Sequence, residues 1–165
     1  MEIILTIMAD DRPGIAQRVA KEIEQYQGNW LESRMATMAG KFAGIVRVDI
    51  PQEQMNKAEQ ALLALREEGV SIHIEQGETK TVLAASEHLI KVVANDRYGI
   101  VHEVTDALAA LAVNVTDLHT EIEPASMSGG SLFRAEIEIT LTDTQKMDDV
   151  VRALEALSPD LMIDF

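Results

Sequence analysis

A five-residue stretch that occurs twice constrains this chain more than any other feature of its sequence. Asp11-Arg12-Pro13-Gly14-Ile15 is echoed 85 positions later (96 − 11 = 85) by Asp96-Arg97-Tyr98-Gly99-Ile100. The match continues at the same offset to Asn29 and Asn114. An echo at fixed spacing indicates two copies of one structural unit. We therefore expect two related units within the 165 residues rather than one larger domain.

Each copy shows the same alternation of strand and helix patterns. Apolar residues alternate before the repeated stretch, as in a strand buried on one face, and recur at spacings of three and four after it, as on one face of a helix. Gly28 fits a left-handed end of the first helix. In the first copy we expect strand 2–9, a helix with Ile15, Val19, Ile23 and Tyr26 on one face, strands 30–38 and 42–50, a helix from Pro51 to Gly69, and strand 70–74.

The second copy repeats the order βαββαβ. We expect strand 88–94, a helix at about 100–111, strands 114–122 and 132–142, a helix at about 144–157, and a strand at 161–165. The boundaries that follow are residues 1–78 for the first unit, 79–87 for a linker, and 88–165 for the second unit. The loop 124–131 is six residues longer than its counterpart (91 − 85 = 6) and is rich in small polar residues. It is either a tolerated insertion or a lid or partner contact.

Composition excludes several classes of protein. The formal net charge is −14 and no basic stripe is present, so direct nucleic-acid binding is not expected. The chain has no cysteine, which rules out disulfides and thiolate metal sites. No apolar run is long enough for a membrane span, and we expect a cytoplasmic protein. We find no catalytic constellation, metal-ligand spacing or cofactor fingerprint, and therefore expect a non-enzyme without a cofactor.

The repeated stretch lies where a strand turns into a helix. The first backbone N–H groups of a helix have no partner within it, and the helix dipole favours negative charge at that end. Such a turn can hold a carboxylate. Asp11 is also a candidate helix cap, and Pro13 suits a first helical turn. Gly14 and Asn29 are equally open to two interpretations, since a turn can require both residues whether or not a ligand binds.

Two βαββαβ units, each with Asp-Arg-x-Gly after its first strand and Asn at the start of its second, resemble a tandem of ACT domains. This resemblance implies an α+β fold of two ferredoxin-like units, each with a four-stranded antiparallel sheet and two helices on one face. Residues 29–42 also resemble the Asn-x-x-x-Ser-Arg-(x)5-Gly-x-Phe pattern of glycine cleavage system transcriptional repressors. Those proteins lack a DNA-binding module and are thought to act through an activator protein in response to glycine.

The resemblance implies a small amino acid, such as glycine, held at the junction of two ACT units. Its carboxylate would bind the N–H groups of Gly14 and Ile15, with Asn29 beside it, while Asp10 or Asp11 would face the ammonium group. Arg12 and Arg97 are each expected to make an ion pair or to contact a partner. The candidate binding residues are Asp11, Arg12, Gly14, Ile15 and Asn29, with Asp96, Gly99, Ile100 and Asn114 in the second copy.

The second copy departs from the pattern, because Tyr98 replaces Pro13, Val113 replaces Gly28, and Leu118-His119 replace Ser33-Arg34. The first copy is therefore the favoured site. We expect a homodimer that acts through a partner regulatory protein. Two alternatives stand: a regulatory subunit of an amino-acid biosynthetic enzyme, and a small enzyme on the same fold.

Overall fold

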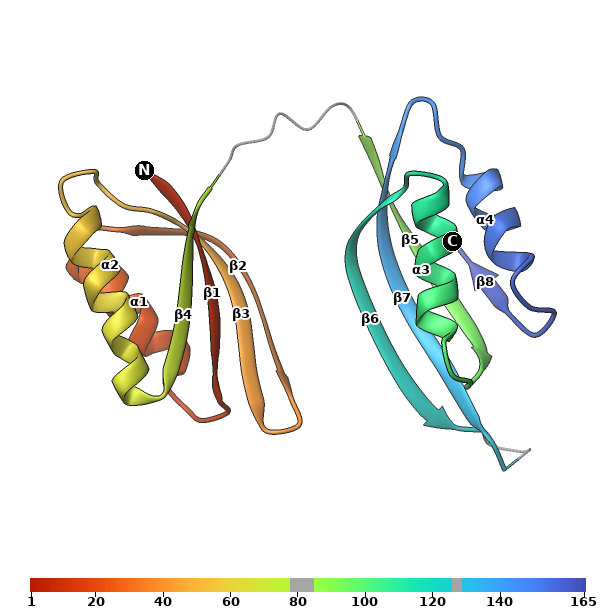
Figure 1. Ribbon diagram of the computed structural model, residues 1–165, viewed down its shortest axis with the longest axis horizontal. Coiled ribbons are helices and arrows are strands. Elements are labelled where there is room, and N and C mark those ends of the chain that lie inside the picture. The colour runs from red at the N-terminus through yellow and green to blue at the C-terminus, as the bar shows by residue number, and fades with distance from the viewer. Residues whose placement is uncertain (78–84, 126–128) are drawn as a thin grey trace. The chain divides into compact units, whose positions relative to one another are not determined.

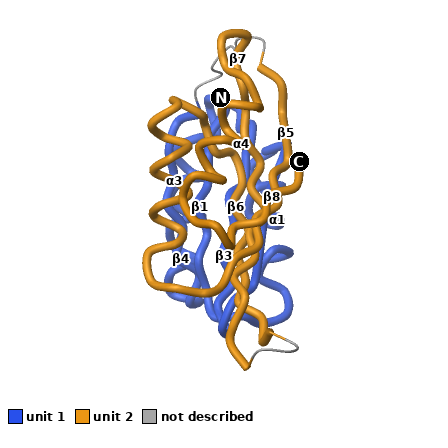
Figure 2. Tube along the Cα trace, turned by 90° about the vertical axis from the view of Figure 1, so that its right-hand side faces the viewer, with its two compact units in different colours: residues 1–80 blue, residues 81–165 orange. Residues whose placement is uncertain are grey.

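The computed structural model describes residues 1–77, 85–125 and 129–165. The chain divides into two compact units, residues 1–80 and residues 81–165, which Figure 2 colours separately. Of the expected linker 79–87, residues 79–84 lie outside the described residues, and residues 85–87 belong to the first strand of the second unit. Residues 126–128 of the loop 124–131 also lie outside the described part of the chain.

Unit 1 has the expected order βαββαβ, with one short 3-10 turn added (Figure 1). Its sheet has the strand order β2-β3-β1-β4, and all neighbouring strands are antiparallel. Both helices cover the same face of that sheet and leave the other face open. The elements are β1 (Glu2–Asp10), α1 (Ile15–Gln25), β2 (Asn29–Met38), β3 (Lys41–Asp49), α2 (Met55–Ala64), η1 (Leu65–Glu68) and β4 (Val70–Gln76).

Unit 2 repeats this architecture. Its sheet has the order β6-β7-β5-β8, with α3 and α4 on one face. The elements are β5 (Ala85–Asn95), α3 (Ile100–Ala110), β6 (Asn114–Pro124), β7 (Ser131–Thr142), α4 (Met147–Glu155) and β8 (Met162–Asp164). The fold class expected from the sequence, two ferredoxin-like α+β units, is confirmed.

Each unit has a core of its own between sheet and helices. In unit 1, alternate residues of β1 point into this core, while the apolar positions of α1 face them as its spacing predicted. Since apolar burial stabilises by about 25 cal/mol per Å², these two layers provide most of the driving force for folding. The fully buried side chains of unit 1 include Leu5, Ile7, Val19, Val46, Val48 and Leu62, and those of unit 2 include Ile90, Val92, Ile137, Ile139 and Leu154.

The start of the first helix differs from the expectation. α1 begins at Ile15, its N-cap residue is Gly14 in a left-handed conformation (φ 93°), and no side chain caps it. The prediction that Asp11 caps this helix is therefore wrong, and Pro13 precedes the N-cap instead of occupying the first turn. Three residues between Asp11 and the helix place the aspartate too early in the chain to cap it.

The end of the same helix also differs. Gln27, not Gly28, takes the left-handed conformation (φ 58°), and its counterpart Ala112 does so in unit 2 (φ 54°). Gly28 is needed for space, because a Cβ atom there would lie 2.8 Å from Ile23 Cγ2 and 2.9 Å from the Ile23 carbonyl oxygen. Unit 2 accommodates Val113 at this position, where the facing residue is Leu108 and has no Cγ2 branch.

Candidate functional site

The loop that joins the first strand to the first helix is anchored to the rest of unit 1 by hydrogen bonds. The Asp11 N–H donates to the carbonyl of Gly40 in the β2–β3 turn at 2.9 Å. The Arg12 guanidinium donates to the carbonyl of Glu68 at 2.5 Å. Arg12 therefore ties the loop to the end of η1.

Unit 2 holds its loop in a related way. The Asp96 N–H donates to the carbonyl of Ser131 at 2.9 Å, which is the counterpart of the bond from Asp11. On the β8 side, the carboxylate of Asp160 accepts a bond from the Asn95 N–H at 2.9 Å. The hydroxyl of Ser158 and this N–H both stabilise the ionised form, which lowers the pKa of Asp160. In unit 2 the Asp160 carboxylate thus accepts a hydrogen bond from the residues around the loop, whereas in unit 1 the Glu68 carbonyl accepts one from Arg12.

The first helix of each unit, α1 in unit 1 and α3 in unit 2, begins at a glycine, which has no side chain to cap it. Gly14 and Gly99 are left-handed N-caps (φ 93° and 81°), and neither helix has a side-chain hydrogen bond at its N-cap. Their carbonyls accept the first helical bonds, from Arg18 N–H at 2.8 Å and Glu103 N–H at 3.0 Å. The first-turn N–H groups, including those of Ile15 and Ile100, therefore receive no side-chain acceptor at this point. An external carboxylate matches their geometry and the helix dipole.

Ion pairs fix the flank of each loop. In unit 1, the Arg18 guanidinium donates to Glu68 at 2.8 and 2.9 Å and to Glu22 at 2.5 Å. These bonds lower the pKa of Glu68 and raise the pKa of Arg18 above its usual range. In unit 2, Arg97 forms a bidentate pair with Glu103 at 2.7 and 2.6 Å, which raises the pKa of Arg97 and lowers that of Glu103.

A pocket of about 560 Å³ lies over the helix-start loop of unit 2. Gly99 and Ile100 form part of its wall, and Thr120 and Ile122 of β6 form another part. The pocket brings together three of the expected binding residues, namely Asp96, Gly99 and Ile100. Its volume is within the range of small-molecule sites. The sequence favoured the first copy as the binding site, whereas this pocket lies in the second. The wall also includes Tyr98, Val101 and Phe133.

The two asparagines do not lie near the helix starts of their own units. Asn29 is opposite Asp49, which is opposite Glu2 at the beginning of β1, whereas Gly14 follows the other end of that strand. A strand of nine residues spans about 27 Å. Asn114 is placed in the same way, since it is opposite Thr140, which is opposite Glu87. Within one unit, the structure does not bring Asn29 to Gly14 or Asn114 to Gly99.

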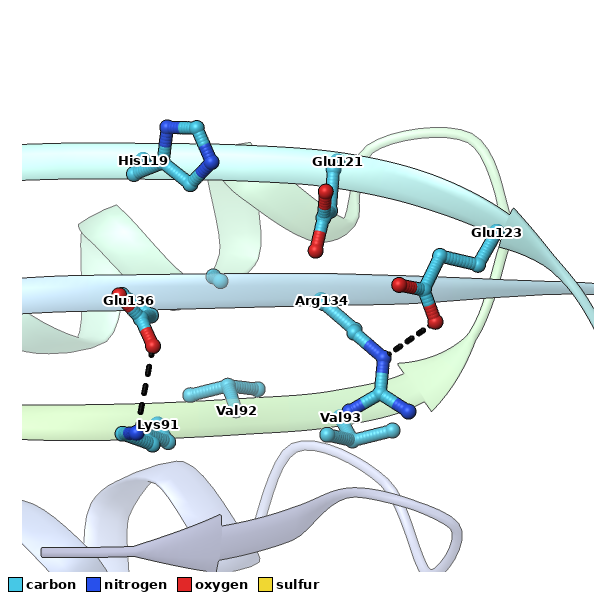
Figure 3. A pocket seen from close by; sticks show the side chains of 9 residues that line it. Lys91, Val92, Val93, His119, Glu121, Glu123, Arg134 and Glu136 are labelled. Atoms are coloured by element: carbon cyan, nitrogen blue, oxygen red, sulfur yellow. Dashed lines mark hydrogen bonds and ion pairs between the residues drawn. The ribbon is translucent and has the colours of Figure 1, made fainter.

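Arg34 of the family-like motif lies on the open sheet face, opposite the exposed Ile45, whereas its neighbour Ser33 is opposite the buried Val46 and so belongs to the helix side of the sheet. Ser33 and Arg34 line a hollow of about 220 Å³ together with Ile4, Ile45 and Arg47. The corresponding face of unit 2 has a hollow of about 320 Å³ around His119 and Arg134 (Figure 3). There Arg134 pairs with Glu123 at 2.6 Å and Lys91 with Glu136 at 3.3 Å. In unit 2, Glu121 borders both this hollow and the pocket over the helix-start loop.

Sequence reasoning missed the residues that approach the loops from distant parts of the chain. Glu68 is 56 residues from Arg12, and Asp160 is 65 residues from Asn95. Among the ion pairs described beside these two loops, the Arg18–Glu22 pair had a local signal, the i, i+4 spacing of opposite charges on a helix. Thr120 and Ile122 became recognisable as pocket residues only when the pairing of β6 was known.

Two further properties bear on the kind of site. Among residues 1–77, 85–125 and 129–165, no group of three or more His, Asp or Glu side chains is arranged to hold a metal ion. The helices within the described ranges are too short or too polar to cross a membrane.

Comparison with known proteins agrees with this architecture. Residues 2–75 match the family model of the ACT domain. A solved structure named "an Unknown Protein from Galdieria sulphuraria" is similar, with a TM-score of 0.82, 27% identity, and coverage of 99% of this chain and 95% of that one. A second solved structure, named "putative glycine cleavage system transcriptional repressor", gives a TM-score of 0.71, 16% identity, and coverage of 99% and 94%. No curated protein sequence matches. Residues 2–75 thus match the ACT-domain family, and the chain as a whole has a tandem ACT-like fold.

Proposed function

We propose that this protein is a non-enzymatic regulator that binds a small amino acid and acts through a partner transcription factor, in the manner of a glycine cleavage system transcriptional repressor. The structural likeness to a protein of that name supports the proposal at the level of the fold. Regulation would follow if the ligand bound one conformation or assembly of the protein more tightly than another.

The observation that carries the proposal is that α1 and α3 both begin at a left-handed glycine, whereas α2 and α4, which also have no side-chain cap, begin at Gln54 and Lys146. Each copy has a glycine, left-handed and without a capping side chain, at the point where Ser, Thr, Asp or Asn usually satisfies the helix. The free N–H groups and the dipole favour a carboxylate. In unit 2 this helix start also borders the pocket of about 560 Å³. A carboxylate that accepts charge-assisted hydrogen bonds there would gain about 1.5–3 kcal/mol from each.

The positions of the asparagines favour a dimer as the binding form. Asn29 lies at the far end of its own unit from Gly14, so it can contact a ligand at a Gly14 loop only if another copy supplies it. We propose that a second copy of the chain does so. Mixing a Gly14→Asp chain with an Asn29→Ala chain would then restore binding at one of the two sites of each mixed dimer. A mixture that binds no better than either variant alone would contradict the shared site.

Calorimetric titration with glycine, and then with a panel of other amino acids, tests the ligand proposal. Gly99→Asp would place a competing carboxylate at the uncapped helix start of α3, and aspartate tolerates left-handed backbone better than most residues. Gly69→Asp is the matched control, because Gly69 is equally left-handed (φ 81°), has open space where the new Cβ atom would lie, and caps η1 in the other unit. We expect Gly99→Asp, and not Gly69→Asp, to weaken binding at least tenfold.

Affinity purification from cells tests the partner proposal. We expect the protein to retain a transcription factor, and the amount retained to change when the amino acid identified by calorimetry is added. Retention of an amino-acid biosynthetic enzyme in place of a transcription factor would contradict the proposal. Turnover of an amino acid by the purified protein would contradict its non-enzymatic part.

A further inference from the structure

The last strand of unit 2 covers only part of the strand that it pairs with. β8 pairs with Lys91, Val92 and Val93, although β5 extends from Ala85 to Asn95. In unit 1, by contrast, β4 pairs with β1 over seven residues from Ile3 to Ala9. Within the described ranges, the segment 85–90 of β5 therefore pairs with β7 on one side and with no strand on the other.

The repeat identifies which backbone groups face this open edge. In unit 1, the Gly77 N–H donates to the Glu2 carbonyl at 3.0 Å, so the backbone of Glu2 points toward the β4 side. Glu87 is the counterpart of Glu2 at the offset of 85. In an antiparallel sheet, alternate residues point both N–H and C=O to the same side. The N–H and C=O groups of Glu87 and Leu89 thus face the open edge, and an extended segment could pair with them.

The open sheet face beside this edge carries more acidic than basic side chains. Glu87 and Leu89 are exposed on the open sheet face, and Leu89 is opposite Glu138 of β7. Further along the same face, Glu136 pairs with Lys91 at 3.3 Å, as Figure 3 shows. The carboxylates on this face of unit 2 are those of Glu87, Asp117, Glu121, Glu123, Glu136, Glu138 and Asp164. Its cations are Lys91 and Arg134, each of which is paired with a glutamate.

We propose that the edge of β5 at residues 85–89 binds an extended segment of a partner protein that carries Lys or Arg at alternate positions. The segment would continue the line of β8 and supply the pairing that β4 supplies in unit 1. Its basic side chains would lie on the acidic open face, while the residues between them would point toward the helix side. This contact would be the partner contact that the proposed function requires, and the tests that follow need no amino acid.

Amide hydrogen exchange in the full-length protein tests the open edge first. Leu89 and Ile4 are counterparts at the offset of 85, and Ile4 is opposite Glu75 of β4. We expect the Leu89 N–H to exchange at least tenfold faster than the Ile4 N–H in the free protein. Equal protection of the two amides would overturn the proposal, because it would mean that the edge is already covered. Protection of Leu89 that rises with protein concentration would also overturn it, since the occupant would then be a second copy.

The second step uses two blocked hexapeptides of opposite charge, acetyl-(Lys-Val)3-amide and acetyl-(Glu-Val)3-amide. We expect the lysine peptide to slow exchange of the Glu87 and Leu89 amides at least tenfold and the glutamate peptide to leave them unchanged. The exposed substitution Glu87→Lys should reduce the effect of the lysine peptide severalfold without unfolding the protein. Equal effects of both peptides, or protection confined to residues away from this edge, would overturn the proposal.

Discussion

Substituting Gly28 by alanine should destabilise unit 1 through a steric clash alone. Gly28 does not have a positive φ, so alanine can adopt its backbone conformation. The added Cβ would lie 2.8 Å from Ile23 Cγ2 and 3.2 Å from Ile50 Cγ1, whereas carbon atoms in contact are about 3.5–4.0 Å apart. Overpacking of this kind costs about 1–3 kcal/mol, and replacing glycine recovers about 0.4–1 kcal/mol through the unfolded state. The free energy of unfolding should fall by about 1–2 kcal/mol.

Urea unfolding followed by tryptophan fluorescence measures this effect in unit 1. The chain has one tryptophan, and Trp30 packs against the core of that unit. With a slope of about 1 kcal/mol per molar urea for so small a unit, the midpoint should fall by about 1–2 M. An unchanged or higher midpoint for Gly28→Ala would refute the steric argument.

A double-mutant cycle identifies the clashing atom. Ile23→Leu removes the Cγ2 branch and reproduces unit 2, where Leu108 faces Val113. The hydrogen bond across this helix end is the same in both units, 2.9 Å from Gly28 N–H to Ile23 and 3.0 Å from Val113 N–H to Leu108. Gly28→Ala should therefore cost less in the Ile23→Leu background, with a coupling of at least about 0.5 kcal/mol. Additive effects would assign the cost to the backbone carbonyl instead.

Three further predictions concern turns and charges of unit 1, each followed by Trp30 fluorescence. Hydrogen bonds from Arg18 lower the pKa of Glu68 below its ordinary value of 4.5, so the unfolded state binds more protons than the folded state. The pair therefore stabilises the fold above pH 4.5, and this stabilisation is lost as the pH falls through the lowered pKa. Glu68→Gln should flatten this part of the curve of stability against pH, and an unchanged curve would contradict the pairing. Ala39→Asn should raise the urea midpoint, because Ala39 and Gly40 both have positive φ (48° and 78°), as in the hairpin turn that prefers Asn-Gly. A lower midpoint would contradict this assignment of the turn. Gly14→Ala should cost about 1–2 kcal/mol from backbone strain alone, since no atom lies within 4 Å of the added Cβ and φ is 93°; a larger loss would indicate a contact.

Much of the fold was predictable because local pattern and tertiary packing agree in this chain. The alternation around Leu5 and Ile7 predicted β1, and the spacing of Ile15, Val19 and Ile23 predicted the buried face of α1. The repeat at 85 residues predicted that the second unit would follow the first. Helix ends were less predictable, because the left-handed residue is Gln27 where the sequence offered Gly28. That choice depends on the space beside Ile23, which only the packed structure reveals.

The candidate site was predicted in part. The repeated glycines mark the helix starts in both units, as expected, but the contacts of Arg12 with Glu68 and of Asn95 with Asp160 join residues far apart in sequence. The position of Asn29 could have been anticipated from geometry. A helix of 11 residues runs about 16 Å back along the strand before it, so the residue that follows the helix lies near the beginning of that strand.

The most direct test of the proposed function is a titration of the 15N-labelled protein with glycine and a panel of larger amino acids, monitored by the backbone amide resonances. We predict a saturable shift of the amides at a helix start, Gly14 and Ile15 or Gly99 and Ile100, with at least one amino acid. We also predict that Gly14→Asp or Gly99→Asp abolishes the shift at the substituted loop. Absence of any shift at both loops with every amino acid tested would contradict the proposed function.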